Sequence, residues 1–253
     1  MAIIELKGWY LPQYQPLREV LKQPADLRLN RSSLLKSGLR ADFLNDIDEV
    51  SSAQWFLCYL EGETVEFYLE GSGSYSIANI DLISREIYFH KQEVFSSLEP
   101  MLFMSIFDPQ CQHTIALMES VGRALEILNE NSRIPLKLEL SNRNTIPLRL
   151  ANIPARKIRQ SLLFIADITP IKQVSNSAEN FISHPLVNLE LGSASALKPQ
   201  SDILLLQEEG EYKGGKQLFD LPESQRIRYS NSEELLETFP TVVKVLLSKY
   251  KLF

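Results

Sequence analysis

Few residues of this chain have the types and spacing that catalysis requires. The sequence holds 3 histidines and 2 cysteines, and the closest pair is Cys111 and His113. A thiol beside an imidazole can serve as nucleophile and base, and both side chains can bind zinc when further ligands join them. Cys58, His90 and His184 show no ligand spacing. We therefore predict no catalytic residue, no metal site and no cofactor from these residues.

A second candidate is the segment Gly210–Lys216, which has the glycine and lysine spacing of a phosphate-binding loop and follows a predicted strand. Gln217 stands where such loops place the Ser or Thr that binds magnesium. Glu208 and Glu211 would also repel a triphosphate, and Pro222 leaves little room for the helix that should follow. We interpret the segment as an exposed loop.

Carboxylates are concentrated in the second quarter of the chain, where residues 51–110 carry 2 basic side chains against 9 acidic ones. Paired carboxylates can act as acid and base or bind a metal. This gives one alternative function, a metal-dependent hydrolase built on these glutamates and His90. Their alternation along predicted strands favours the simpler interpretation, a solvent-exposed face without chemistry. The glutamates are Glu61, Glu63, Glu66, Glu70 and Glu86.

The segment 140–166 has the opposite charge, with five basic residues and no acidic one. Arginine suits bidentate contact with carboxylate or phosphate. We predict a partner-binding or anion-binding site formed by Arg143, Arg149, Arg156, Lys157 and Arg159. Three interpretations stay open: pairing with the chain's own acidic strands, an acidic protein partner, or a nucleic-acid backbone. Nucleic acid is less favoured, because few aromatic residues are interleaved with these charges.

Composition limits the class of protein. The 253 residues are 44% hydrophobic and 23% charged, with a net charge of −6, as in ordinary globular proteins. No apolar run is long enough to span a membrane, the N-terminus lacks the features of a signal peptide, and two cysteines make no disulfide framework. We expect a soluble cytoplasmic protein, a non-catalytic interaction or assembly factor, with a nucleic-acid-associated protein as an alternative.

The elements that would position these residues indicate an α+β fold. Turn residues and alternation predict an antiparallel β-meander over about 54–90, beginning with a strand at Trp55–Leu60. Leucines at three- and four-residue steps predict helices within 26–50, and similar spacing predicts a helix within 91–107 and another from about Gln112 to Asn129.

A second group of strands is predicted after residue 135. The buried runs Ser161–Asp167 and Asp202–Gln207 are the strongest of these candidates, and 136–140, 146–150, 187–191 and 226–229 complete the set. Helices are predicted from Ser232 and over Thr241–Tyr250. We divide the chain into α+β lobes at 1–107 and 108–253, with one continuous domain as the alternative.

Overall fold

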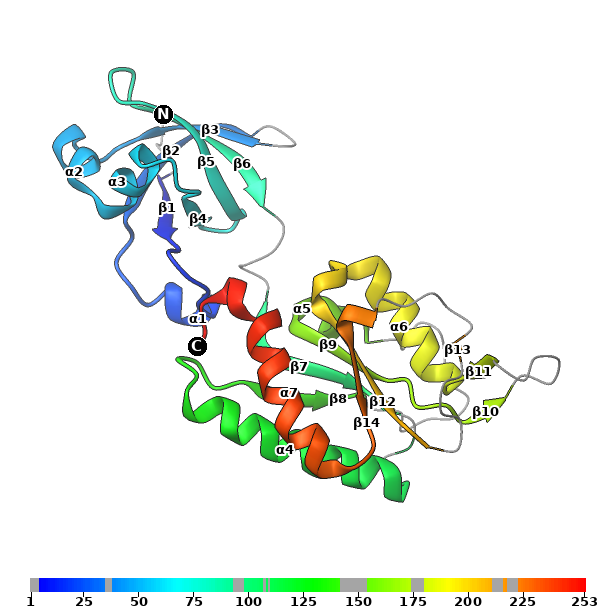
Figure 1. Cartoon of the computed structure of the whole chain (residues 1–253). Coiled ribbons are helices and arrows are strands. Elements are labelled where there is room, and N and C mark those ends of the chain that lie inside the picture. The colour runs from blue at the N-terminus through cyan, green and yellow to red at the C-terminus, as the bar shows by residue number, and fades with distance from the viewer. Residues whose placement is uncertain are drawn as a thin grey trace. The chain divides into compact units, whose positions relative to one another are not determined.

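The computed structural model describes residues 5–34, 38–92, 98–106, 108, 110–141, 154–173, 180–210, 216–217 and 223–253. Contacts within the chain separate two compact units, Met1–Leu98 and Glu99–Phe253, each with its own sheet (Figure 1). The main sheet of the first unit is antiparallel and that of the second is parallel, with helices beside both, and the second unit also has a small three-stranded sheet. The predicted α+β class is confirmed.

The first unit is a small closed barrel with strand order β1-β2-β3-β6-β5-β4. Every neighbouring pair is antiparallel. Its strands are β1 (Glu5–Tyr10), β2 (Leu27–Leu34), β3 (Gly38–Phe43), β4 (Glu66–Leu69), β5 (Gly73–Asp81) and β6 (Glu86–Gln92). Its helices are α1 (Leu17–Val20), α2 (Ile47–Ser52) and α3 (Gln54–Leu60). Closure leaves no free sheet edge in this barrel.

The barrel core explains where the sequence-based elements were wrong. The run Trp55–Leu60 is helix α3, because Trp55 and Phe56 are buried while Leu57 and Leu60 are exposed. A short apolar run cannot by itself distinguish a strand from a helix. The predicted meander therefore starts only at β4.

Residues 26–50 also differ from their prediction. Leu27 and Leu29 are buried on β2, as are Leu39, Ala41 and Phe43 on β3, with the intervening side chains less buried or exposed. This two-residue alternation belongs to strands. It coincides with the leucine steps from which we predicted helices, and α2 alone of this stretch is helical.

The second unit is organised around a five-stranded parallel sheet of order β14-β12-β9-β7-β8. Its strands are β7 (Glu99–Ser105), β8 (Lys137–Leu140), β9 (Ser161–Asp167), β12 (Ile203–Glu208) and β14 (Arg226–Tyr229). β7 replaces the helix predicted within 91–107. Its residues Met101–Ser105 are all buried, as expected for a strand covered on both faces.

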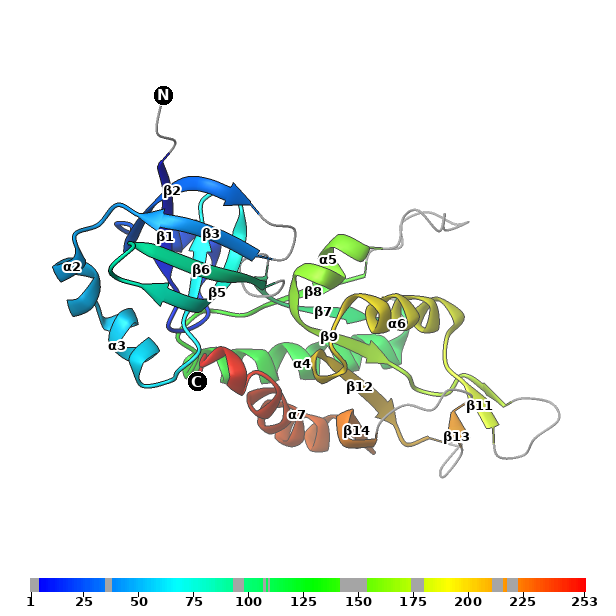
Figure 2. The ribbon, with the colours of Figure 1, turned by 90° about the horizontal axis from the view of Figure 1, so that it is seen from above.

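Helices cover both faces of this sheet (Figures 1 and 2). One face carries α4 (Gln112–Glu130) and α7 (Ser232–Leu246), which pack on each other, and the other carries α5 (Ala155–Gln160) and α6 (Pro185–Leu197). The predicted strand at 187–191 is part of α6, and α7 continues through Pro240 where we predicted two helices. Smaller elements are β10 (Lys172–Gln173), β11 (Asn180–Ile182), β13 (Lys216–Gln217), η3 (Gln200–Asp202), η4 (Glu223–Gln225) and η5 (Ser248–Tyr250).

The strand order has a consequence for where a ligand would bind. Numbered along the chain, the five parallel strands lie in the order 2-1-3-4-5, which is that of flavodoxin-like doubly wound sheets. Such sheets bind ligands beyond the carboxyl ends of their strands, near the point where the chain reverses direction across the sheet. Here that point lies between β7 and β9. Among the described helices, none is long and apolar enough to cross a membrane.

Candidate functional site

Polar residues occupy the carboxyl edge of the parallel sheet on the face covered by α4 and α7. Phe164 and Ala166 of β9 and Leu205 of β12 belong to the core packed against α6. Strand side chains alternate between faces, so Asp167 at the end of β9 and Glu208 at the end of β12 point to the opposite face. These two carboxylates approach the first turn of α4.

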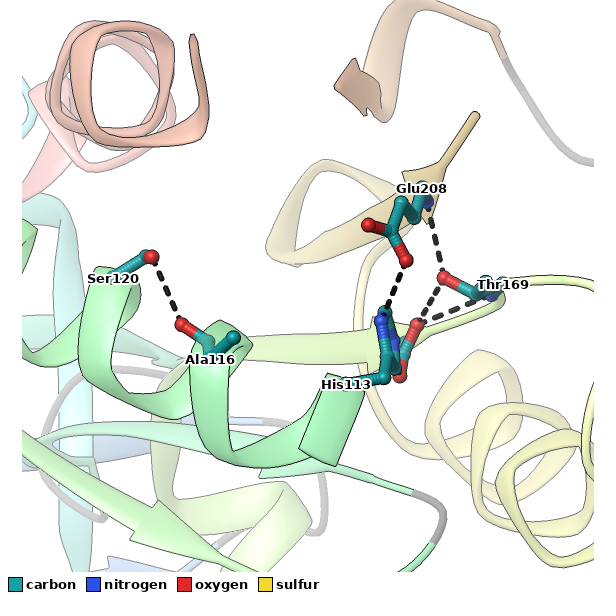
Figure 3. A network of polar contacts seen from close by, with 6 residues as sticks. His113, Ala116, Ser120, Thr169 and Glu208 are labelled. Atoms are coloured by element: carbon teal, nitrogen blue, oxygen red, sulfur yellow. Dashed lines mark hydrogen bonds and ion pairs between the residues drawn. The ribbon is translucent and has the colours of Figure 1, made fainter. Parts of the chain in front are cut away.

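His113, in the first turn of α4, joins the two carboxylates (Figure 3). Its Nε2 lies 3.1 Å from Asp167 Oδ2, and its Nδ1 lies 2.7 Å from Glu208 Oε2. The Asp167 side chain is 3% exposed and that of His113 is 25% exposed. The hydrogen bond to Asp167, reinforced by the negative charges of Asp167 and Glu208, raises the pKa of His113 to about 9 despite its burial. The imidazole is therefore a cation at neutral pH, with an N–H toward each carboxylate.

Thr169 extends this network into the segment that follows β9. Its backbone N–H and its hydroxyl donate to Asp167 Oδ1 over 3.1 and 2.6 Å, and its oxygen accepts from the backbone N–H of Glu208 over 3.0 Å (Figure 3). Both Asp167 oxygens are thus engaged. Hydrogen bonds of this kind offset the cost of burying a carboxylate and fix the ends of β9 and β12 relative to each other.

Tyr229 borders the same place from β14. Register pairs it with Glu208, so both side chains lie on one face of the sheet. Tyr229 is 4% exposed, and its enclosed hydroxyl lies near the Thr169 side chain. Burial, followed by the negative charges of Asp167 and Glu208, raises the pKa of Tyr229. Its phenol therefore stays protonated beside the two carboxylates.

A pocket of about 170 Å³ opens beside this cluster, between the first turns of α4 and α7. His113, Glu208 and Tyr229 contribute to its wall together with Gln112, Ala116, Leu117, Ser120, Ser232 and Leu235. A hollow that combines a few polar groups with apolar walls is the usual form of a small-molecule site.

The opposite face of the sheet carries a second polar contact. The Ser105 hydroxyl at the end of β7 donates to the Glu190 carboxylate of α6, and Glu190 is only 2% exposed. Ser105 lies on the same face as Phe103, which packs in the core with α6. Polar groups therefore line both faces of this sheet edge.

The predicted basic site is only partly within the described residues. Arg156, Lys157 and Arg159 lie on α5 and are exposed, and Lys157 pairs with Glu139 of β8. Arg143 and Arg149 lie outside the described residues. α5 packs on the face of the sheet opposite α4 and contributes nothing to the His113 cluster.

The other sequence candidates do not form a site in the described part of the chain. Cys111 is a free thiol at the start of α4, and the contacts of His113 are to carboxylates. Glu86 forms an ion pair with Arg40. The side chains of Glu61, Glu63 and Glu70 are exposed, and so is that of His90 on β6. Most of 210–216 lies outside the described residues. No three His, Cys, Asp or Glu side chains in the described segments are arranged to hold a metal ion.

Sequence reasoning missed Asp167 and Glu208 although it identified their strands. Each acid ends or directly follows a buried apolar run, SLLFIAD and DILLLQ. The carboxyl ends of parallel strands meet at one edge, so interpreting both runs as parallel strands would have brought the acids together. His113 lies in the first turn of the helix predicted from about Gln112, so it would then be expected near the same edge.

Comparisons with known proteins leave the chain without an assigned family. No family model matches it, and no curated protein matches it. The CMP N-glycosidase BcmB from Clostridium botulinum is a weak structural neighbour, with 19% identity and a TM-score of 0.33 over 56% of this chain and 98% of that one. The metal-soaked flavodiiron core of Flv1 from Synechocystis sp. PCC6803 has 13% identity and a TM-score of 0.35 over 60% and 36%. Both TM-scores are too low to bear on function.

Proposed function

We propose that the unit 99–253 binds a small polar molecule at the carboxyl edge of its parallel sheet. The observation that carries this proposal is the convergence of His113, Asp167 and Glu208 from three separate elements at the carboxyl edge of the parallel sheet, at β9 and β12, next to the reversal point between β7 and β9. Perturbed ionisable groups in a hollow are typical of functional sites. The adjoining pocket supplies the space.

The arrangement favours binding over acid–base catalysis by His113. Both ring nitrogens contact carboxylates, so neither is free to accept a proton from a substrate. A pKa of about 9 also lies well above the range that suits a general base at neutral pH.

The proposal is tested by screening small polar metabolites while following the imidazole NMR signals. We expect a bound ligand to shift the His113 signal and to leave the signal of His90, an exposed histidine of β6, unchanged. Assignment comes from His113→Asn and His90→Asn. A broad library in which no compound moves the His113 signal would contradict the proposal.

A second candidate function is contact with an acidic partner through α5. Arg156 and Arg159 are exposed on α5, and Arg156 Nε donates to Gln160 Oε1 over 3.2 Å, so both cations lie on the same exposed surface. We propose that they bind an acidic protein surface, as expected of an interaction or assembly factor of the cytoplasm. A nucleic-acid backbone is the alternative partner.

Charge reversal distinguishes these partners. Arg156→Glu with Arg159→Glu should abolish a salt-sensitive interaction recovered from cell extract, while Arg18→Glu with Lys22→Glu, two exposed cations of the other unit, should leave it intact. Titration with an oligonucleotide in increasing salt tests the nucleic-acid alternative. Equal binding by both double variants would exclude α5 as the contact.

A further inference from the structure

We infer that the pocket between the first turns of α4 and α7 takes a small organic cation, a primary or secondary ammonium group on a short apolar stem. This inference rests on the proposed function and specifies the ligand class of the same site. Three properties of the pocket carry it: an excess of negative charge, a wall that offers hydrogen-bond acceptors, and a small apolar lining.

The charged cluster beside the pocket has an excess of negative charge. Asp167 and Glu208 each carry one negative charge, and His113, whose pKa is raised to about 9, supplies one positive charge between them. Among the described residues that line the pocket there is no Lys or Arg. A cation that enters the pocket therefore meets an opposite charge, whereas a phosphate or carboxylate would meet a like charge.

The arginines of β14 do not offset this excess. Register pairs Arg226 with Leu205 and places Arg228 two residues further along β14. Leu205 belongs to the core packed against α6, and strand residues two apart share a face, so both arginines lie on the face of the sheet opposite α4. On that face Glu223 forms an ion pair with each of them.

The helix starts beside the pocket do not reverse the sign of the charge. Each helix N-terminus is equivalent to roughly half a positive charge. At α7 this charge is met by acidic residues of the first turn, and the Glu234 carboxylate accepts from the Ser230 N–H over 2.7 Å. At α4 it remains, but it is smaller than the full negative charge that His113 leaves unbalanced.

The wall presents hydrogen-bond acceptors to a ligand. Glu208 gives Oε2 to His113, and its other oxygen, Oε1, is directed away from the imidazole and has no partner among the described residues (Figure 3). The Ser120 hydroxyl donates to the Ala116 carbonyl over 2.9 Å, so its oxygen is left as an acceptor. An ammonium group brings N–H donors and no acceptor, which matches these two oxygens.

The donors of the cluster are already used. The two ring N–H groups of His113 point to Asp167 and Glu208. The Tyr229 hydroxyl is enclosed near the Thr169 side chain and does not reach a ligand. An anion, which needs donors, would find none in this cluster.

The remaining wall is largely apolar, and the pocket is small. Ala116, Leu117 and Leu235 line it beside the exposed Gln112 and Ser232. Its volume of about 170 Å³ lies below the roughly 300–1,000 Å³ of pockets for drug-sized ligands. A short hydrocarbon stem can cover the apolar surface while its ammonium group reaches Glu208.

The test compares size-matched probes on the full chain: the propyl, butyl and pentyl members of the amines, alcohols and carboxylates. In ligand-observed NMR at pH 7, an amine should bind at least roughly tenfold more tightly than its alcohol, because it forms a charge-assisted hydrogen bond. The matching carboxylate should bind more weakly than the alcohol. The amine should also shift the imidazole signal of His113 and leave that of His90 unchanged.

Three variants locate the contact. Glu208→Gln keeps the size of the side chain and removes its charge, so it should weaken amine binding by roughly tenfold and leave alcohol binding unchanged. Glu233→Gln, the same change at an exposed carboxylate of α7 outside the pocket wall, should leave both affinities unchanged. Ala116→Leu extends an exposed helical side chain into the pocket and should abolish binding of every probe.

Several outcomes would overturn the inference. An alcohol or carboxylate that binds as tightly as its amine, with a shift of the His113 signal, would reject the cation and leave the proposed binding site standing. Unchanged amine affinity in Glu208→Gln, at a matched melting temperature, would reject Glu208 as the contact. If no amine binds while another compound of the metabolite screen shifts the His113 signal, the ligand class alone fails. If no compound of either set shifts that signal, the proposed function fails as well.

Discussion

His113 is the residue on which the site depends. It holds a positive charge between Asp167 and Glu208, two carboxylates that would otherwise repel each other at the ends of adjacent strands. Its folded pKa of about 9 exceeds the ordinary value of 6.5. The proton on His113 is therefore part of what holds this edge of the sheet together.

The pH dependence of stability follows from this shift. A group whose pKa is raised by folding stabilises the folded state fully below its unfolded pKa and loses that contribution as pH rises through the folded pKa. The free energy of unfolding should thus contain a contribution present at pH 6 that declines between about 6.5 and about 9. Urea denaturation at several pH values measures it. His113→Asn should remove this contribution, and His90→Asn should retain it.

The two carboxylates should differ in their effect on His113. The hydrogen bond to Asp167 is the largest cause of the raised pKa, and the contribution of Glu208 is smaller. Asp167→Asn should therefore lower the pKa of His113 further than Glu208→Gln does, as measured by NMR titration of the imidazole. An equal or reversed order would show that the Asp167 contact is not the dominant one.

At the scale of elements, the segment Trp55–Leu60 can be tested directly, because a helix and a strand would bury different side chains of it. Trp55 is 3% exposed whereas Leu60 is 64% exposed. Trp55→Ala should cost roughly 3–5 kcal/mol of stability through loss of buried surface. Leu60→Gln should change stability by no more than about 0.5 kcal/mol. Chemical denaturation gives both values, and a large loss in Leu60→Gln would contradict the observed helix.

An element was predicted correctly where the spacing of its apolar residues and the length of the apolar segment indicated the same type of secondary structure. α4 was predicted nearly to its ends because its apolar residues follow a helical period over five turns, and β9 was predicted because SLLFIAD is both apolar and short. The prediction for β2 was wrong because the few leucines of this stretch, several of which lie an even number of residues apart, also fit the four-residue spacing of a helix. The site could not be predicted because strand order and direction depend on long-range pairing. The charged residues of α5 were visible in sequence, but no local pattern connects His113 with Glu208.

At the scale of the whole molecule, each unit contains its own core. One cluster of buried side chains, including Phe67 and Phe89, lies within residues 27–89, and another, including Phe164 and Leu205, lies within 103–205. Compact units of this kind are expected to fold as separate bodies. The candidate site belongs entirely to the second.

A fragment of residues 99–253 should therefore fold and keep its site. We expect its His113 pKa to remain about 9, because Asp167 and Glu208 both lie within the fragment. Circular dichroism checks the fold and NMR titration checks the pKa. A folded fragment in which the pKa of His113 lies near 6.5 would show that the site requires the first unit.

The strand order of the barrel sets a sequence of events during protein synthesis. β1, β2 and β3 form one local antiparallel group and β4, β5 and β6 form another, and the two groups meet through the pairs β1–β4 and β3–β6. A ribosome delivers the first group well before the second. Until residue 92 has emerged, the partners of β1 and β3 are incomplete, and unpaired strand edges favour aggregation. The nascent barrel thus has a defined interval of exposure, during which chaperone binding to the first three strands is expected.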